Sequence, residues 1–170
     1  MKKYKYKIVY KGDSKFMKFL NFFVRIFNKT FMTGYVTTIG STIYTPYSNK
    51  YVSHSTMIHE LQHLKDSKDY PVLYELSYLL CLPTLFTMRS FWEKRAHRWS
   101  IGYRMAYFTK SLDGYRDFII RRYTGSDYLW MHWSKKRMGE WFDKTKQSVP
   151  KEADYVKAEQ EFLAQFEEEK

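Results

Sequence analysis

Two histidines and a glutamate stand close together near the middle of the chain, in the order His59-Glu60-x-x-His63. If this segment is a helix, residues four apart lie on one face, so both imidazoles can reach one metal ion. Glu60 lies one position on, about 100° around the helix axis, at the edge of that face. A carboxylate there can reach a metal-bound water without being a ligand. The pattern therefore predicts a metal site with His59 and His63 as ligands and Glu60 beside the water.

The residues around this motif favour a metal site over a chance match. Apolar side chains flank the histidines on both sides, which suits a helix buried along one face. The alternative is a helix whose histidines are half-buried polar residues without a metal. We favour the metal site, because a match of all three positions is a rare event in a chain with 5 histidines.

A catalytic zinc ion usually has three protein ligands and one open position, so a third ligand must come from elsewhere. Glu93 is the favoured candidate, because Ala96, three positions on, would let its helix approach the first helix closely. Two alternatives remain open. Ser90 and Glu93 also match a capping box, in which the carboxylate would only bind a backbone N–H at the start of a helix. Glu75 is a rival carboxylate on a more apolar segment.

The motif His59-Glu60-x-x-His63 followed by Glu93-x-x-Ala96 resembles the gluzincin branch of the zincin metallopeptidases, in particular small, uncharacterised metallopeptidase-like proteins of phages and bacteria. The resemblance covers about residues 33–99. It implies an α+β fold with a zincin-like (minigluzincin) core, in which a small mixed or antiparallel sheet accompanies the motif helix and a second, glutamate-bearing helix. Further helices would follow towards the C-terminus.

The same resemblance implies a zinc-dependent metallopeptidase acting on a peptide or protein substrate. Zn²⁺ would be held by His59, His63 and Glu93, and Glu60 would act as the general base of peptide-bond hydrolysis. Two alternatives stay open. One is a catalytically idle zincin-fold structural or binding protein, for example a component of a viral particle. The other is a basic nucleic-acid-binding protein with a structural metal.

The chain departs from the gluzincin pattern four residues after the expected ligand glutamate. Many gluzincins carry an aspartate there that orients a ligand histidine, whereas this chain carries His97. This imidazole could orient a ligand, act as a further ligand or contact substrate. A second electrophile should also stabilise the oxyanion, and His97, Tyr103 and His132 are the candidates.

Regular patterns predict the elements that position these residues. Alternation of Lys with apolar residues predicts a strand at Tyr4–Tyr10. β-Branched and aromatic runs at Tyr35–Ile39 and Ser41–Thr45, on either side of Gly40, predict a tight hairpin or a bulged strand. The edge of the Ser41–Thr45 strand could pair with an extended substrate. Helical spacing and helix-start signals predict helices at Lys15–Asn28, which Ser14 would cap, Ser53–Ser67, Pro71 to about Leu82, Ser90 towards Lys110, Tyr115–Tyr123, Tyr128–Lys144 and Lys151–Glu168.

Two apolar segments are candidates for contact with a membrane. The helix Lys15–Asn28 is apolar and basic, and we favour a core-facing helix with a solvated basic edge over a helix that lies on a membrane surface. The apolar run Leu73–Met88 contains Glu75 and Pro83 and is shorter than a spanning helix needs. We therefore expect no transmembrane segment, no signal peptide, and a place in the cytoplasm, or in the virion or host cytoplasm if a phage encodes the chain.

The charge is uneven along the 170 residues. Lys and Arg number 29 against 18 Asp and Glu, so the formal net charge is +11, yet residues 151–170 carry a net −4. We expect one metallopeptidase domain at 1–147 and an acidic helix within 148–170 that packs on it or on a protein partner. The basic body could attract nucleic acid, but no nucleic-acid motif accompanies it.

The remaining composition excludes several classes of protein. The single cysteine, Cys81, excludes an intrachain disulfide framework and a cysteine-rich zinc site. A hydrophobic content of 44% excludes a disordered chain. The three tryptophans Trp130, Trp133 and Trp141 stand at near-helical spacing, which favours a core stripe over an exposed basic aromatic surface.

Overall fold

The computed structural model describes residues 3–26, 28–79, 88–108, 112–125 and 130–169. Its fold is α+β, as expected, with helices packed around a small mixed sheet. The strands are β1 (Tyr4–Tyr10), β2 (Thr37–Ile39), β3 (Thr42–Thr45) and β4 (Phe166–Glu168), in the order β2-β3-β1-β4. β1 pairs in parallel with β3 and β4, and β2 pairs antiparallel with β3.

The predicted hairpin is confirmed, because β2 and β3 turn at Gly40, whose φ of +58° suits a glycine. The prediction of an exposed edge on the Ser41–Thr45 strand is wrong. β3 is paired on both sides, to β2 and to β1, so the outer strands of the sheet are β2 and β4.

Six of the seven predicted helices begin within two residues of the predicted position, and the short helix Phe31–Gly34 was not predicted. After the short 3₁₀ helix η1 (Lys11–Asp13), the helices are α1 (Lys15–Val24), α2 (Phe31–Gly34), α3 (His54–Asp69), α4 (Pro71–Leu79), α5 (Arg89–Tyr107), α6 (Asp113–Thr124), α7 (Lys135–Ser148) and α8 (Glu152–Leu163). The predicted end of α4, near Leu82, lies outside the described residues. α1 is four residues shorter than predicted, and α7 begins at Lys135 rather than Tyr128. Among the described residues, no helix has the length and apolar character to cross a membrane.

The end of the chain differs most from its prediction. α8 stops at Leu163, and Phe166–Glu168 forms β4 instead of a last helical turn. The backbone N–H of Tyr4 donates to the carbonyl of Gln165 at 2.7 Å, and that of Glu169 donates to Tyr6 at 2.7 Å. Pairing with β1 therefore draws this acidic segment into the sheet.

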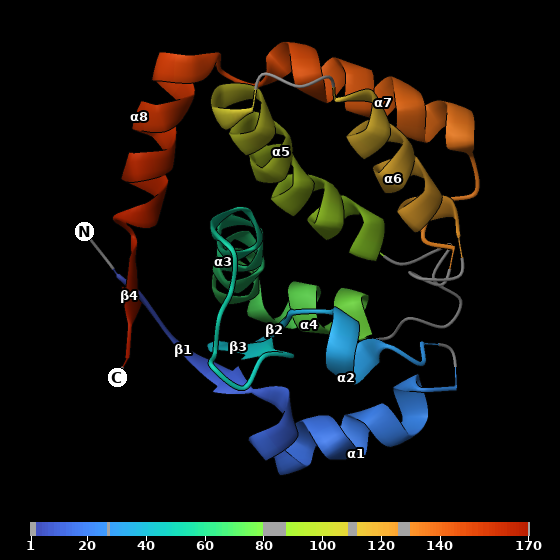
Figure 1. The fold of residues 1–170 in the computed structure, drawn as a ribbon, viewed down its shortest axis with the longest axis vertical. Helices are drawn as coiled ribbons and strands as arrows, with labels where there is room; N and C mark the ends of the chain where they lie inside the picture. The colour runs from blue at the N-terminus through green and yellow to red at the C-terminus, as the bar shows by residue number, and fades with distance from the viewer. Residues whose placement is uncertain (1–2, 27, 80–87, 109–111, 126–129, 170) are drawn as a thin grey trace.

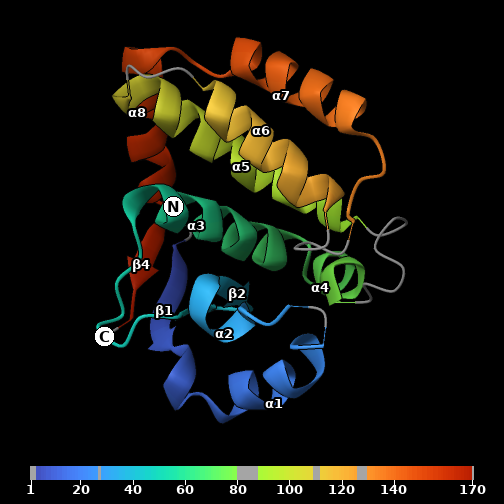
Figure 2. The same ribbon diagram turned by 45° about the vertical axis from the view of Figure 1, so that its right-hand side comes forward.

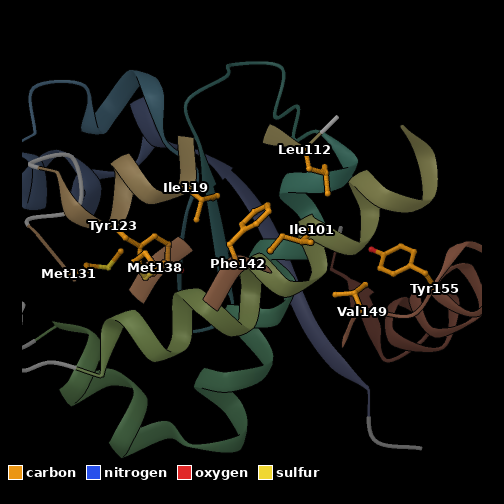
Figure 3. Close-up of a cluster of buried hydrophobic side chains, with 9 residues drawn as sticks. All are labelled: Ile101, Leu112, Ile119, Tyr123, Met131, Met138, Phe142, Val149 and Tyr155. Carbon is orange, nitrogen blue, oxygen red and sulfur yellow. The ribbon is translucent and has the colours of Figure 1, made fainter. Parts of the chain in front are cut away.

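α3 lies at the centre of the molecule. Figure 2 shows it between the strands and α5, with α6 and α7 on the far side of α5. One buried cluster fills the space between the sheet, α3 and α8, and consists of Ile43, Ile58, Leu61 and Phe162. A second cluster, shown in Figure 3, joins α5 to α6, α7 and α8 and consists of Ile101, Leu112, Ile119, Tyr123, Met131, Met138, Phe142, Val149 and Tyr155.

α8 packs on the rest of the chain through its aromatic residues. Phe162 stacks on Trp99 of α5 with ring centroids 4.4 Å apart, and the Tyr155 hydroxyl donates to the Trp99 carbonyl at 3.1 Å. Gly102 leaves room for the Tyr155 ring, since a Cβ there would lie 2.3 Å from a ring carbon. The acidic helix α8 thus packs against α5 of the same chain.

The prediction that three tryptophans form a stripe in the core is wrong for Trp130 and Trp133. Trp130 and Trp133 precede α7 and are exposed, whereas Trp141 packs against the second cluster. The helix that would have aligned all three begins only at Lys135, so its periodicity does not extend to the first two.

Candidate metal centre

α3 positions the three residues of the central motif. Ser53 caps the helix by accepting a hydrogen bond from the Thr56 backbone N–H. The helix then runs between the sheet and α5, so its sides are covered and the motif is enclosed. Glu60 and His63 are buried, and the side chain of His59 is 12% exposed.

α5 brings a carboxylate to the same place. Its N-cap is Met88, without a side-chain cap, so Ser90 lies inside the helix and does not form a capping box with Glu93. Glu93 instead faces α3 and is 2% exposed. Ala96 is fully buried, which fits the close approach of the two helices that the sequence suggests. The rival Glu75 lies on α4, where it accepts a hydrogen bond from Ser67.

The donor atoms of two histidines and the glutamate form a compact triangle. The Nε2 atoms of His59 and His63 are 3.1 Å apart, and they lie 3.5 and 3.6 Å from Oε2 of Glu93. A tetrahedral zinc ion with bonds of about 2.0–2.1 Å separates its ligand atoms by about 3.4 Å. The triangle therefore has the size that a zinc ion requires.

His97 adds a fourth donor to this group, one helical turn after Glu93. Its Nε2 atom lies 4.0 Å from Oε2 of Glu93, and its ring centroid lies 4.5 Å from that of His59. With these two residues it forms a second triad, whose ligand atoms all lie within 4.8 Å. The triad with His63 is tighter and matches zinc better. The buried Nε2 of His97 has no hydrogen-bond partner among the described residues, as expected for an atom that a bound cation would face.

The Glu93 carboxylate and the histidines that face it shift one another's pKa values. Burial acts to raise the pKa of Glu93, but the facing imidazoles of His63 and His59 hold that pKa well below its usual range. Burial acts to lower the pKa of His63, and the Glu93 carboxylate reverses this and raises it. Burial, with the neighbouring His59, lowers the pKa of His97 well below its ordinary value. One carboxylate and facing imidazole nitrogens are a donor set that suits Zn²⁺, which binds an imidazole only after it has lost its proton.

Glu60 lies near His63 and is bonded to strand β2. Its Oε2 accepts a 2.7 Å hydrogen bond from the hydroxyl of Thr38 on β2. Nearby, the fully buried ammonium of Lys11 donates to the Phe31 carbonyl at 2.7 Å and to the Thr37 hydroxyl at 2.9 Å. Burial lowers the pKa of Lys11 to about 8, although the Glu60 carboxylate acts to raise it. Glu60 therefore lies between the metal-facing residues and the edge strand.

The two other oxyanion candidates make their contacts elsewhere. Tyr103 packs against His54, with ring centroids 5.3 Å apart. His132 accepts a hydrogen bond from the Ser134 backbone N–H and stacks on Trp133. Within the described part of the chain, the structure brings neither side chain together with the metal-facing group.

Several neighbours of the site gave no signal in the sequence. Thr38 and Lys11 come from the sheet region, and their roles depend on contacts with distant residues. Two buried tyrosines also lie against the histidines. The Tyr74 ring is 6.3 Å from that of His63, and the Tyr123 ring is 5.7 Å from that of His97. In a chain with 20% aromatic residues, the sequence does not show which of them lie against the histidines.

Comparisons with protein-family models, with curated proteins and with solved structures found no match to this chain.

Proposed function

We propose that this chain is a zinc-dependent metallopeptidase in which His59, His63 and Glu93 hold the metal. The observation that carries the proposal is the triangle of donor atoms, 3.1–3.6 Å on a side, built from two helices. A metal ion explains why a buried carboxylate and two imidazoles converge on one point, because it compensates for the water that these groups lose on burial.

Glu60 is the residue that distinguishes hydrolysis from metal binding alone. When bound, zinc would lower the pKa of a water molecule and polarise a peptide carbonyl. Glu60 then accepts the proton of the attacking water and returns it to the leaving amine. Its hydrogen bond from Thr38 holds the carboxylate in one orientation, which suits a general base.

The free edge of β2 supports a peptide as the substrate class. β2 is one of the two outer strands of the sheet, and Thr38 at its middle bonds to Glu60. An extended peptide that paired with this edge would lie beside the general base. Main-chain pairing of this kind gives affinity without strong sequence preference.

The test compares Glu60→Gln with the wild-type protein for zinc content and for cleavage of a labelled, unstructured protein. We expect the variant to keep one zinc per chain and to lose at least about a hundredfold in hydrolysis, because the base is removed and the ligands are not. Glu75→Gln is the matched control, since its amide oxygen can still accept from Ser67. Wild-type zinc binding without any cleavage would support the idle zincin-fold binding protein instead.

The second candidate function, nucleic-acid binding with a structural metal, rests on a different surface. Trp133 is exposed beside Arg137, whose guanidinium lies 4.8 Å from the centre of its ring. Exposed aromatic rings with basic neighbours are typical of single-stranded nucleic-acid surfaces. Salt-sensitive binding to a single-stranded oligonucleotide that survives zinc removal and is lost in Trp133→Ala would favour this function over hydrolysis.

A further inference from the structure

α1 presents apolar side chains to solvent, contrary to the prediction of a core-facing helix. Only Met17 of this helix is fully buried, while Phe19 is 65% exposed. The other members of the exposed set are Phe16, Phe22, Phe23 and Ile26, the last just after the helix. We call these five residues the α1 apolar face.

The position of α1 leaves this face uncovered. The helix packs on η1 and α2, and Figures 1 and 2 both show it at the outer end of the molecule, away from α7. On the side of α1 turned away from solvent, Met17 is fully buried. The exposed phenylalanines belong to neither of the two buried clusters, and a contiguous apolar patch of this kind marks an interaction surface.

The exposed rings form one connected patch. Phe23 lies edge-on to both Phe19 and Phe22, with centroids 5.3 Å apart in each pair. The guanidinium of Arg25 lies 5.6 Å from the centre of the Phe22 ring. An apolar patch with a cation at its border is thus preformed on the folded chain.

The charge around the patch has a single sign. Between Ser14 and Thr30 the sequence contains no acidic residue. The cations in this segment are Lys15, Lys18, Arg25 and Lys29, and all four are exposed. A helix with aromatic residues on its outer face and lysine or arginine beside them has the composition of helices that lie on anionic membranes.

We propose that α1 docks this protein on the surface of an anionic lipid bilayer, with the α1 apolar face in the interface and the four cations against the headgroups. This proposal is independent of the metal site. A second copy of the chain is a poorer occupant, because it would bring two positive faces of a +11 protein together. The acidic end of the same chain is also unsuitable, since β4 is already paired with β1.

The test is co-sedimentation of the full chain with vesicles of phosphatidylcholine alone or with about 30% phosphatidylserine, which gives the vesicle a negative surface potential like that of a charged inner leaflet. We expect binding to the anionic vesicles, weakened by salt, and little binding to the neutral ones. Phe19→Ser with Phe22→Ser should weaken it at least about tenfold, because both side chains lie on the exposed face. Val72→Ser is the matched control and removes an exposed apolar side chain far from α1 in sequence.

A second variant separates charge from apolar contact. Lys18→Glu with Arg25→Glu keeps every phenylalanine and should also abolish binding to anionic vesicles. Thermal melts establish that each variant is folded. Equal sedimentation of wild type and both double variants, or no binding of wild type, would overturn the proposal. A lipid-independent dimer that Phe19→Ser with Phe22→Ser disrupts would do the same and would assign the face to a second copy.

Discussion

The hydroxyl of Thr38 donates a 2.7 Å hydrogen bond to Oε2 of Glu60, and this bond joins the edge strand β2 to α3. Glu60 thus turns towards the sheet, whereas its neighbour His59 turns towards Glu93 on α5. Adjacent residues of a helix point about 100° apart, so one helix can serve both partners. His59 and Glu60 therefore contact different elements although they are adjacent in the sequence.

Thr38→Val should lower hydrolysis while leaving zinc bound. Valine keeps the shape of threonine but cannot donate, so the buried carboxylate of Glu60 loses a hydrogen bond and its fixed orientation. We expect kcat/KM to fall by roughly tenfold, which corresponds to about 1.4 kcal/mol. Unchanged kcat/KM, with zinc content equal to that of wild type, would mean that the Thr38 bond plays no part in positioning the base.

His63→Ala and Glu93→Ala should each remove most of the bound zinc. Each variant deletes one corner of the triangle, and two remaining ligands hold zinc far more weakly than three. Elemental analysis of protein purified without chelator measures the zinc content. His54→Ala is the control, because its half-exposed side chain pairs with Glu159 rather than with the triangle. One zinc per chain in His63→Ala would exclude that residue as a ligand.

His97→Ala should weaken zinc binding less than His63→Ala does. The Nε2 atom of His97 lies 4.0 Å from Oε2 of Glu93, whereas that of His63 lies 3.6 Å away and belongs to the tighter triangle. Loss of a group beside the ligands typically costs about 10- to 100-fold in metal affinity. Competition with a zinc chelator gives the affinities. Equal losses in the two variants would show that His97 is a full ligand.

Lys11 should make the protein more stable as the pH rises from about 8 to 10.5. Burial lowers the pKa of Lys11 to about 8 in the folded chain, while the ordinary value is 10.5. Between these values the unfolded chain binds more protons than the folded chain, so the free energy of unfolding increases with pH, by up to about 3 kcal/mol.

Lys11→Met isolates this effect from other groups that titrate in the same range. Urea unfolding of both proteins at about pH 7.5 and about pH 10, near the two ends of this window, measures the difference. We expect the wild type to gain stability relative to Lys11→Met over this interval. Parallel behaviour of the two proteins would show that the buried ammonium does not titrate there.

Gly102→Ala should destabilise the packing of α8 on α5. The added Cβ would lie 2.3 Å from a ring carbon of Tyr155, whose hydroxyl is bonded to the Trp99 carbonyl. Overpacking of this kind costs about 1–3 kcal/mol. Gly114→Ala in α6 is the control, since nothing lies within 4 Å of its Cβ position, and it should be neutral or slightly stabilising. Similar melting temperatures for the two variants would contradict the close approach at Gly102.

Local sequence patterns determined most elements of this protein. Alternation identified β1, Gly40 placed the hairpin turn, and the predicted helix start at Ser53 lies within one residue of the start of α3. These features depend on a residue and its near neighbours, so periodicity and capping are enough to find them. The motif on α3 also predicted that His59 and His63 share a face, because helix geometry is the same in every protein.

Tertiary structure alone decided the rest, because it depends on which surfaces meet. Glu93 could equally have capped a helix, and only the packing of α5 on α3 brings it within 3.6 Å of both histidines. The helix predicted for residues 151–168 ends at Leu163, and Phe166–Glu168 forms β4 instead. The reason is that β1 offered a free edge for backbone hydrogen bonds. Likewise, the spacing of the phenylalanines in α1 predicted a helix with apolar sides, but not which side would be buried. A sequence specifies local geometry, whereas the partner of each face is settled by the balance of contacts across the whole folded chain.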